Sequence, residues 1–357
     1  MEVNSCPECG VPGIFNERQI WLNNGDIVAG PEKKNRLGFI ECENLDPLFK
    51  EIEEIIGISI EPLVVNITAR GVEQYTLNLI PDEIREMVKA KQLDPGTLAG
   101  PILEYCHILG YGRYQMVDSR YERDDDDYSI LRIEAPFSVP EAAGSIAGVI
   151  SGLAGGENAV TYKEISPGLY EFVTRRTKYP EILKEKMKTA PYSHKDGDLE
   201  LERCATCGAP EGLSAFKWDL DRGLILNKRN GRRMAILGPE LLDILFDALE
   251  AELGETIPAA VVEAQRRFVK TGFYSIDEIR DEGDFRTQLA LRGMGNLREL
   301  TMRPQGIHMR IDNVAGYLLT VGMVQGLFDV AFDIDSNVVW ELTEEGDLDM
   351  EVKPKPS

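Results

Sequence analysis

Two pairs of cysteines, far apart in the chain, are the residues best suited to chemistry. Cys6 and Cys9 form one Cys-x2-Cys pair and Cys204 and Cys207 form the other, and a glycine follows each pair. Each pair puts two thiolates on one tight turn, whereas a tetrahedral metal ion needs four. The spacing therefore predicts one closed site of four thiolates. In such a site the ion is structural, because no coordination position is left for a substrate.

Zinc is the metal that we expect at this site, with iron as the alternative, because rubredoxin-like iron takes the same four ligands. A disulfide or a set of unligated thiols also fits the spacing. In a further alternative each half of the chain has its own ion, completed by Cys42 or a histidine. Cys42 aligns with Pro239, which argues against two equivalent sites. The sequence does not decide whether the four cysteines share one metal.

The cysteine pairs belong to a longer internal repeat. Residues Leu45–Gly57 align with Leu242–Gly254 without a gap, and six of the thirteen positions are identical. The further matches are Asp82–Arg85 with Asp277–Arg280, Gly110-Tyr-Gly112 with Gly293-Met-Gly295, and Gly148-x3-Gly152 with Gly322-x3-Gly326. The repeating unit is much longer than the 20–50 residues of solenoid repeats, so the pattern indicates two tandem domains.

The segments between these motifs predict an α+β fold with two tandem pseudo-symmetric repeats. Each repeat is expected to hold a small β zinc-knuckle and hairpin element, followed by helices and an antiparallel sheet. Asp46 is expected to cap the first long helix, with Pro47 as its first residue and Gly57 at its end. The expected bounds are 1–60 for the knuckle, hairpin and helix of repeat 1, 61–180 for its larger domain, 181–202 for a linker, 203–257 and 258–352 for the same parts of repeat 2, and 353–357 for a frayed tail.

Composition and charge exclude several classes of protein. The chain has 39 basic and 61 acidic residues, which gives a formal charge of −22. Nucleic acid and anionic membrane surfaces would repel such a protein. The N-terminus is not a basic leader followed by an apolar run, and the most apolar stretch, Val139–Gly155, is short and contains Glu141. Six cysteines without an export signal favour a reducing compartment, so we expect a cytoplasmic protein.

Small residues follow one face of the helix expected over 140–154. They are Gly144, Ala147, Gly148 and Ser151. Such a face either allows close backbone packing or leaves volume for a ligand. The matching helix, expected over 314–328, has bulkier side chains. If either repeat holds a ligand cavity, we expect it in the first.

Catalytic motifs are not evident in the sequence. Cys106 and His107 are adjacent, but the second repeat has Leu289 and Ala290 at these positions. We therefore interpret the pair as the buried end of a helix. A nucleophile elbow and a glycine-rich phosphate loop are both missing, and no residue is assigned a catalytic role.

One part of the chain has a recognisable order of motifs: Gly110-Tyr-Gly112, the strand residues Arg132–Glu134, the small-residue segment Ala143–Leu153, and the strand segments Val160–Lys163 and Leu169–Val173. This order resembles the 4-vinyl reductase domain family, whose members are also called hydrocarbon-binding domains. The resemblance covers about 75–180 and, more faintly, 262–352. It implies an α+β domain with a pocket between helices and sheet for small, often aromatic or apolar, molecules. Family members that bind metal in this domain use cysteines near the glycine helix, where this chain has Ala142 and Ala143.

The expected function is that of a zinc-containing protein that binds or senses a small apolar or aromatic molecule through its first repeat, with a degenerate second repeat. The expected ligand-binding residues are Tyr111, Phe137, Gly144, Ile146, Ala147, Gly148 and Ser151. One alternative is an enzyme or accessory subunit that acts on an aromatic or tetrapyrrole intermediate, although no redox cofactor motif is found. Another alternative is an assembly factor or scaffold. A protein partner or a homodimer fits each of these functions.

Overall fold

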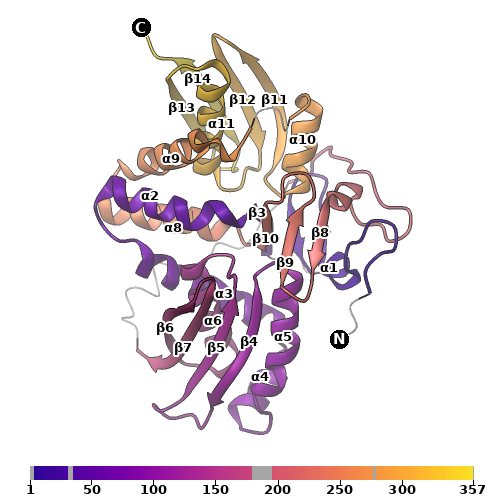
Figure 1. Ribbon diagram of the computed structural model, residues 1–357, viewed down its shortest axis with the longest axis vertical. Helices are drawn as coiled ribbons and strands as arrows, with labels where there is room; N and C mark the ends of the chain where they lie inside the picture. Colours follow the sequence, from indigo (N-terminus) through magenta and orange to yellow (C-terminus); the bar gives the residue numbers. More distant parts are fainter. Residues whose placement is uncertain (1–3, 31–34, 179–194, 276–278, 357) are drawn as a thin grey trace.

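The structure is a computed structural model that describes residues 4–30, 35–178, 195–275 and 279–356. Two α+β lobes lie at opposite ends of the molecule, and helices α2 (Leu45–Ile56) and α8 (Glu240–Leu253) are layered between them (Figure 1). Beside these helices lies a sheet to which both repeats contribute. The expected α+β class with two pseudo-symmetric repeats is confirmed. Most of the expected linker, and Asp277 and Glu278 of one expected match, lie outside the described residues.

The shared sheet is built from the segments that follow the two cysteine pairs. Its strand order is β1-β2-β3-β10-β9-β8, and all neighbours are antiparallel. The two repeats meet where β3 pairs with β10, with Met234 opposite Glu41 and Leu237 opposite Gly38. The bounds are β1 (Gln19–Trp21), β2 (Ile27–Ala29), β3 (Asn35–Glu41), β8 (Phe216–Asp219), β9 (Leu224–Asn227) and β10 (Arg233–Leu237), with α1 (Gly13–Arg18), η1 (Cys42–Asn44) and η2 (Glu211–Ala215) at their ends.

Each lobe combines a four-stranded antiparallel sheet with a long helix, the small-residue helix α6 in the first lobe and the bulkier α11 in the second. The first sheet has the order β4-β5-β7-β6 and the second has the matching order β11-β12-β14-β13. The first lobe contains α3 (Glu61–Leu79), α4 (Asp82–Lys89), α5 (Gly96–Ile108), β4 (Arg113–Arg120), β5 (Tyr128–Glu134), α6 (Val139–Ala154), β6 (Glu157–Ser166) and β7 (Leu169–Thr177). The second contains α9 (Ile257–Phe268), η3 (Val269–Phe273), α10 (Glu282–Leu291), β11 (Asn296–Arg303), β12 (Gly306–Asp312), α11 (Tyr317–Phe332), β13 (Ser336–Leu342) and β14 (Leu348–Pro354).

The two repeats exchange packing surfaces. Helix α2 of the first repeat packs against α9 of the second, and α8 of the second packs against α3 of the first. At the first contact the Asn44 side chain donates a hydrogen bond of 3.0 Å to the Gln265 side chain, and both residues are buried. Figure 1 shows the resulting layer of two helices between the lobes. Neither repeat therefore completes its core alone.

Two equivalent arginines fasten each lobe to the strands of the other repeat. Arg36 on β3 donates to the carbonyl oxygen of Asn313 at 2.6 Å, and Arg233 on β10 donates to that of Ala135 at 2.8 Å. Asn313 and Ala135 occupy the same place in the two lobes, and both have a positive φ, near +55° and +52°. Arg36 also forms an ion pair of 2.6 Å with the fully buried Asp26.

The glycines of α6 serve close packing against α3. A Cβ atom on Gly144 would lie 2.5 Å from the Val65 carbonyl oxygen, and one on Gly148 would lie 2.4 Å from that of Ala69. Both distances are too short for any side chain, so the two helices approach each other at their backbones.

The second lobe repeats this contact between α11 and α9. A Cβ atom on Gly322 would lie 2.5 Å from the Val262 carbonyl oxygen, and one on Gly326 would lie 3.0 Å from that of Arg266. Gly322 and Gly326 thus correspond to Gly144 and Gly148. The match of Gly148-x3-Gly152 with Gly322-x3-Gly326 is wrong by four residues, because α6 carries the same glycine spacing twice in succession.

Two local expectations are corrected by the structure. Helix α2 begins at Leu45 after Asn44, so Asp46 is not its N-cap, although the helix does end at Gly57, whose φ is +73°. The Asp46 carboxylate instead accepts a hydrogen bond of 3.2 Å from the backbone N–H of Val139, at the start of α6. At the other end of the chain the expected tail is ordered further than predicted, because β14 continues to Pro354.

A buried carboxyl group lies at the same end of α6. Glu141 is 6% exposed, and its Oε1 atom has no hydrogen-bond partner among the described residues. Burial, and then the negative charge of Asp46, raise the pKa of Glu141 to about 8. The carboxyl group is therefore protonated in the folded protein at neutral pH.

We expect Glu141→Gln to remove a pH-dependent penalty. The folded-state pKa is above the ordinary value of 4.5, so between these values the folded chain keeps a proton that the unfolded chain has lost, and stability falls as pH rises. The free energy of unfolding of the variant, relative to wild type, should rise by about 1 kcal/mol per pH unit from pH 5 to 8. Urea unfolding at pH 5, 6.5 and 8 measures this change. Glu54→Gln on the exposed face of α2 is the matched control, and a pH-independent difference for Glu141→Gln would contradict the prediction.

Candidate functional site

The four cysteines of the two Cys-x2-Cys-Gly turns, called knuckles below (Cys6–Gly10 and Cys204–Gly208), lie close together, as their spacing predicted. Cys6 and Cys204 place their sulfur atoms 3.8 Å apart, and those of Cys9 and Cys207 are 3.5 Å apart. All four sulfurs lie within 4.8 Å of one another and could hold a metal ion. Four thiolates at 2.3 Å from a tetrahedral zinc ion would be about 3.8 Å apart. The geometry of the residues therefore fits a four-thiolate site.

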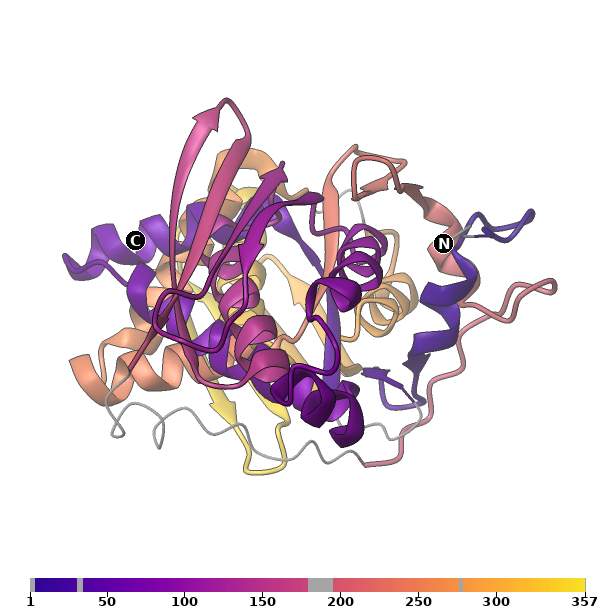
Figure 2. The same cartoon turned by 90° about the horizontal axis from the view of Figure 1, so that it is seen from below.

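The backbone of the two knuckles is the same. In each, the glycine after the second cysteine donates its N–H to the carbonyl oxygen of the first at 2.9 Å, from Gly10 to Cys6 and from Gly208 to Cys204. These glycines have φ near +78° and +75°, the left-handed region that other residues adopt at a cost. Figure 2 shows the N-terminal segment with α1 beside the segment of the second knuckle. The pseudo-two-fold relation of the repeats thus brings both half-sites together.

Two sulfurs of this cluster differ in their electrostatic surroundings. The backbone N–H of Cys9 is directed at the Cys6 sulfur and lowers the pKa of Cys6 to about 7. Burial raises the pKa of Cys9 to about 12. A divalent cation among the four sulfurs would supply the charge that a buried thiolate lacks. The donor set suits zinc or iron, and the geometry alone does not separate these metals.

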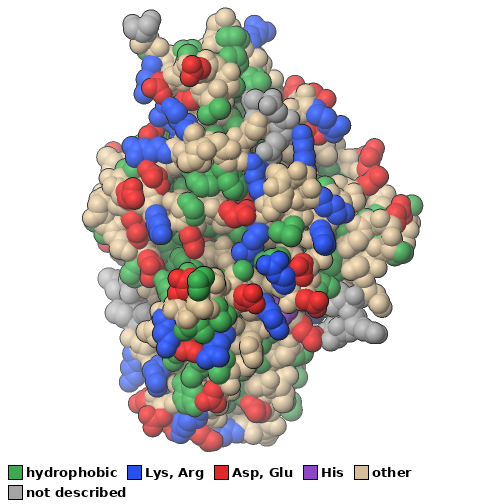
Figure 3. Space-filling view, in the orientation of Figure 1, with side chains coloured by type: hydrophobic (Ala, Val, Ile, Leu, Met, Phe, Trp, Pro, Cys, Tyr) green, Lys and Arg blue, Asp and Glu red, His purple; other side chains and the backbone are tan. Residues whose placement is uncertain are grey.

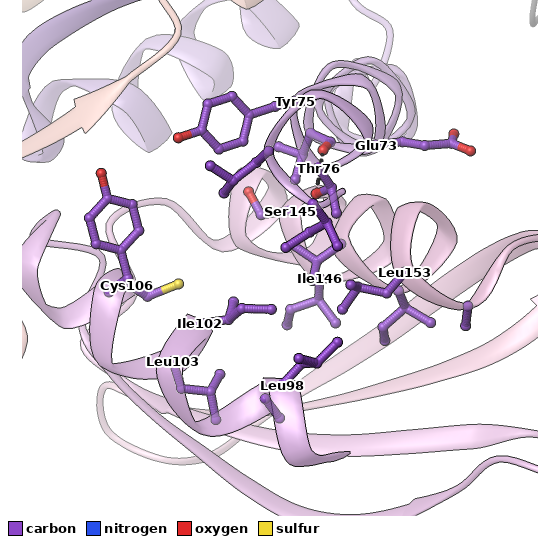
Figure 4. Close-up of a pocket in the computed structure, with 18 of the residues that line it drawn as sticks. Glu73, Tyr75, Thr76, Leu98, Ile102, Leu103, Cys106, Ser145, Ile146 and Leu153 are labelled. Carbon is purple, nitrogen blue, oxygen red and sulfur yellow. Dashed lines mark hydrogen bonds between the residues drawn. The ribbon is translucent and has the colours of Figure 1, made fainter. Parts of the chain in front are cut away.

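A cavity of about 1070 Å³ lies in the first repeat. Helix α5 forms one wall, α3 and α6 form the opposite wall, and strands β4 and β5 contribute to the lining. Figure 4 shows Leu98 and Ile102 of α5 across the space from Ile146 and Leu153 of α6. The lining is largely apolar, which is typical of sites for apolar small molecules.

Tyrosines gather in the lining of this cavity, next to Cys106. They are Tyr75, Tyr105, Tyr111 and Tyr114. Burial raises the pKa of each of them above its ordinary value, and raises that of Cys106 to about 12. The group is therefore uncharged at neutral pH.

The tyrosine hydroxyls differ in their partners. The Tyr111 hydroxyl donates to the Ile236 carbonyl oxygen at 2.6 Å, and the Tyr105 hydroxyl accepts from Gln19 Nε2 at 2.7 Å. The Tyr114 hydroxyl has no hydrogen-bond partner among the described residues. A buried hydroxyl without a partner is uncommon in a folded protein, so Tyr114 is a candidate contact for a polar ligand group.

Of the residues expected to bind a ligand, Tyr111 and Ile146 line the cavity. The other five lie behind its wall: Phe137, Gly144, Ala147, Gly148 and Ser151. The Phe137 ring packs at 4.6 Å from the Tyr111 ring, and the Ser151 hydroxyl accepts a hydrogen bond from Asn158. The small-residue face of α6 is turned to α3, so the ligand space lies on another face of the same helix.

The sequence reasoning missed the contribution of α5 and of the segment after the first knuckle. Cys106 is at the end of a helix, as interpreted, but it borders the cavity. The apolar residues Leu98, Ile102 and Cys106 recur at i, i+4 and i+8, a helical signal that Gly96 and Pro101 obscured. Gln19 also lines the cavity, and no local pattern marks it.

In the view of Figure 3, acidic and basic side chains are interspersed over the visible face rather than gathered in one charged patch. Among the described residues, no helix combines the length and apolar character needed to cross a bilayer.

No protein-family model and no curated protein sequence matches the chain. Several solved structures are similar to part of the chain. The phenol-responsive sensory domain of the transcription activator PoxR, with phenol, is 16% identical with a TM-score of 0.31, over 50% of this chain and 96% of that one. A mutant of Cs H-NOX is 15% identical with a TM-score of 0.25, over 34% and 75%. An oxygen-binding H-NOX domain related to soluble guanylate cyclases is 13% identical with a TM-score of 0.23, over 39% and 80%. Similarity at this level does not define a shared function.

Proposed function

We propose that this protein binds or senses a small apolar or aromatic molecule in the cavity of its first repeat, and that a four-cysteine zinc site clamps the two repeats together. The observation that supports the binding function is a cavity of about 1070 Å³ with a largely apolar lining. Its volume is in the range of small-molecule sites. The resemblance to the 4-vinyl reductase domain family supports the same class of ligand.

The second repeat is proposed to be a structural partner. The correspondence of Gly144 with Gly322 places Phe328 of α11 where α6 has the cavity residue Ile150. Phe328 is fully buried, and its ring packs 4.9 Å from that of Phe332. Aromatic side chains thus fill the position that borders ligand space in the first repeat.

The proposed ligand is uncharged where it meets the inner cavity. Three arginines that border the cavity are paired with carboxylates: Arg36 lies 2.6 Å from Asp26, and both Arg120 and Arg176 lie 3.3 Å from Asp127. Arg18 also borders the cavity, and its guanidinium lies over the Tyr105 ring. The tyrosines and Cys106 are neutral. An anionic group placed among these neutral side chains, away from the Arg18 guanidinium, would lose its hydration without gaining a cation, which is costly.

We expect Ile146→Trp to block ligand binding by filling the cavity. Ile146 projects into the space between α5 and α6 (Figure 4). The affinity for the neutral apolar fluorophore N-phenyl-1-naphthylamine should fall at least about tenfold, equivalent to about 1.4 kcal/mol, in a fluorescence titration. Val330→Trp is the matched control, since Val330 is 49% exposed on α11. An Ile146→Trp protein that is folded and binds the fluorophore as wild type does would contradict the proposed function.

A further inference from the structure

One buried side chain at the cavity comes from the segment that follows the first cysteine pair. Gln19 is 2% exposed, lines the cavity, and donates from Nε2 to the Tyr105 hydroxyl at 2.7 Å. Its Oε1 atom has no hydrogen-bond partner among the described residues. Reversal of the amide would leave the nitrogen unpaired instead, so one polar atom of Gln19 is free in either orientation. That atom is available to a polar group of a ligand.

The partner of Gln19 lies on the helix that walls the cavity. Helix α5, described over its whole length, has Ile108 as its one buried residue. Several of its other apolar side chains, among them Leu98 and Ile102, border the cavity. Pro101 lies inside this helix and removes one backbone hydrogen bond from it. Tyr105 is held from outside the helix by Gln19 and by the Arg18 guanidinium, which lies 4.5 Å from the centre of its ring. These two residues thus add to the contacts that α5 makes with β4 and β9 and, at its C-terminal end, with β8.

Arg18 and Gln19 are in turn positioned by the four-cysteine cluster. They follow α1, a helix of six residues and about 9 Å that begins four residues after Cys9. The Asn16 side chain on α1 donates to the carbonyl oxygen of Cys207 at 2.8 Å, which ties the helix to the other knuckle. Phe15 is fully buried, and its ring packs 5.2 Å from that of Trp218. Helix α1 is thus held in part by the second knuckle, through Asn16, and in part by β8, through Trp218.

We infer that Gln19 is a positioning residue through which the four-cysteine site controls how firmly the cavity retains its ligand. The inference rests on the proposed binding function. With metal bound, α1 is fixed, and Gln19 holds α5 over the cavity through Tyr105. When the metal is lost the knuckles separate, α1 shifts, and α5 loses its anchor, so the ligand leaves faster.

The second repeat has no equivalent of this polar pair. The indole N–H groups of Trp21 and Trp218 donate to matching carbonyl oxygens of the two lobes, those of Leu291 and Ile108. This match places Phe216 at the position of Gln19. Phe216 packs its ring 4.6 Å from that of Phe39 in an apolar contact. The polar pair thus occurs in the repeat that contains the described cavity.

The test measures the dissociation rate of N-phenyl-1-naphthylamine by stopped-flow fluorescence from protein loaded with Zn²⁺. Removal of the metal with EDTA should raise the rate about tenfold. Gln19→Leu should raise it by a similar factor while the zinc content stays at wild-type level, and EDTA should then add little. Tyr105→Phe keeps the ring under Arg18 and removes the hydroxyl, so it should match Gln19→Leu. Gln288→Leu, on the equivalent helix α10 of the other repeat, should leave the rate unchanged.

The possible outcomes separate the inference from the proposed function. A wild-type protein that shows no saturable binding of the fluorophore would remove the binding function itself. If wild type binds but EDTA leaves the dissociation rate unchanged, or if Gln19→Leu and Tyr105→Phe both dissociate as slowly as wild type, then the inference is wrong. Circular dichroism of each sample establishes that the fold is retained. If Gln19→Leu loses its helical signal, Tyr105→Phe decides the result.

Discussion

Cys9→Ser is expected to release the bound metal and to lower the melting temperature by about 10 °C or more. Four sulfurs within 4.8 Å form the site, and a hydroxyl is a poor substitute for a thiolate toward zinc. The loss affects the whole molecule because the site joins residues near the start of the chain to the first strands of the second repeat. Mass spectrometric metal analysis together with scanning calorimetry measures both effects.

The control for this experiment is Cys106→Ala, which removes a thiol that lies outside the cluster. It should keep one metal ion per chain. The visible spectrum of the same samples separates the two candidate metals, because an iron–thiolate site is coloured and a zinc site is not. Cys9→Ser protein that still binds one ion tightly would show that the four cysteines do not act as one site.

Gly148→Ala should destabilise the protein by about 3 kcal/mol, although alanine normally favours a helix over glycine by about 1 kcal/mol. The added Cβ atom would lie 2.4 Å from the Ala69 carbonyl oxygen and 2.8 Å from the Glu73 nitrogen. Both are backbone atoms of α3 and cannot move away as a side chain could. The two helices would have to separate, and the contact along their length would loosen. Urea unfolding measures the change in free energy.

Gly100→Ala in α5 is the matched control for this substitution. No atom outside its own helix backbone and chain neighbours lies within 4 Å of the position of its Cβ. The free energy of unfolding should change by less than about 1 kcal/mol, because the helix propensity of alanine is opposed by the steric restriction on a residue that precedes Pro101. The pair of variants also distinguishes the two roles considered for the small-residue face of α6. A face that leaves volume for a ligand would accept the methyl group at Gly148 without loss of stability.

The approach of the four cysteines was predictable because its information is local and occurs twice. Cys-x2-Cys followed by glycine fixes the knuckle backbone, and the left-handed conformation of Gly10 and Gly208 follows from that motif. A chain duplicated as a whole has a pseudo-two-fold relation available to it, which brings two half-sites together. The helix end at Gly57 was predictable for the same reason, since glycine there has a positive φ.

The exchange of packing surfaces could not be read from the sequence. The apolar stripe on α2 indicates that one face of this helix is buried, and the duplicated stripe on α8 indicates the same for that helix. Because both copies offer similar partners, the pattern does not say which repeat each stripe contacts. The hydrogen bond between Asn44 and Gln265 is one contact that is specific to the packing of α2 against the other repeat, and it joins segments that are distant in sequence. Asp46 illustrates the same limit, since its partner Val139 is also far from it in sequence.

The cavity was predictable in its repeat but not in its lining. Small residues on α6 gave the correct lobe, because bulkier residues such as Phe328 occupy the matching helix. The same small residues do not border the cavity. Small side chains on one helix face serve both close helix packing and ligand space, so the sequence pattern does not distinguish these two roles. Gln19 was out of reach, because it is placed by a tertiary contact with Tyr105.

The pairing of β3 with β10 has a consequence for the history of the protein. A single-copy ancestor would have had an open sheet edge at β3 and only two of the four thiolates that complete a tetrahedral metal site. It would therefore have had to form a dimer of identical subunits. A fusion of two such genes would make that association permanent within one polypeptide. Once fused, the copies no longer had to be alike. Aromatic residues could fill the interior of one copy while the other copy kept its cavity. The sheet that both copies share would still form.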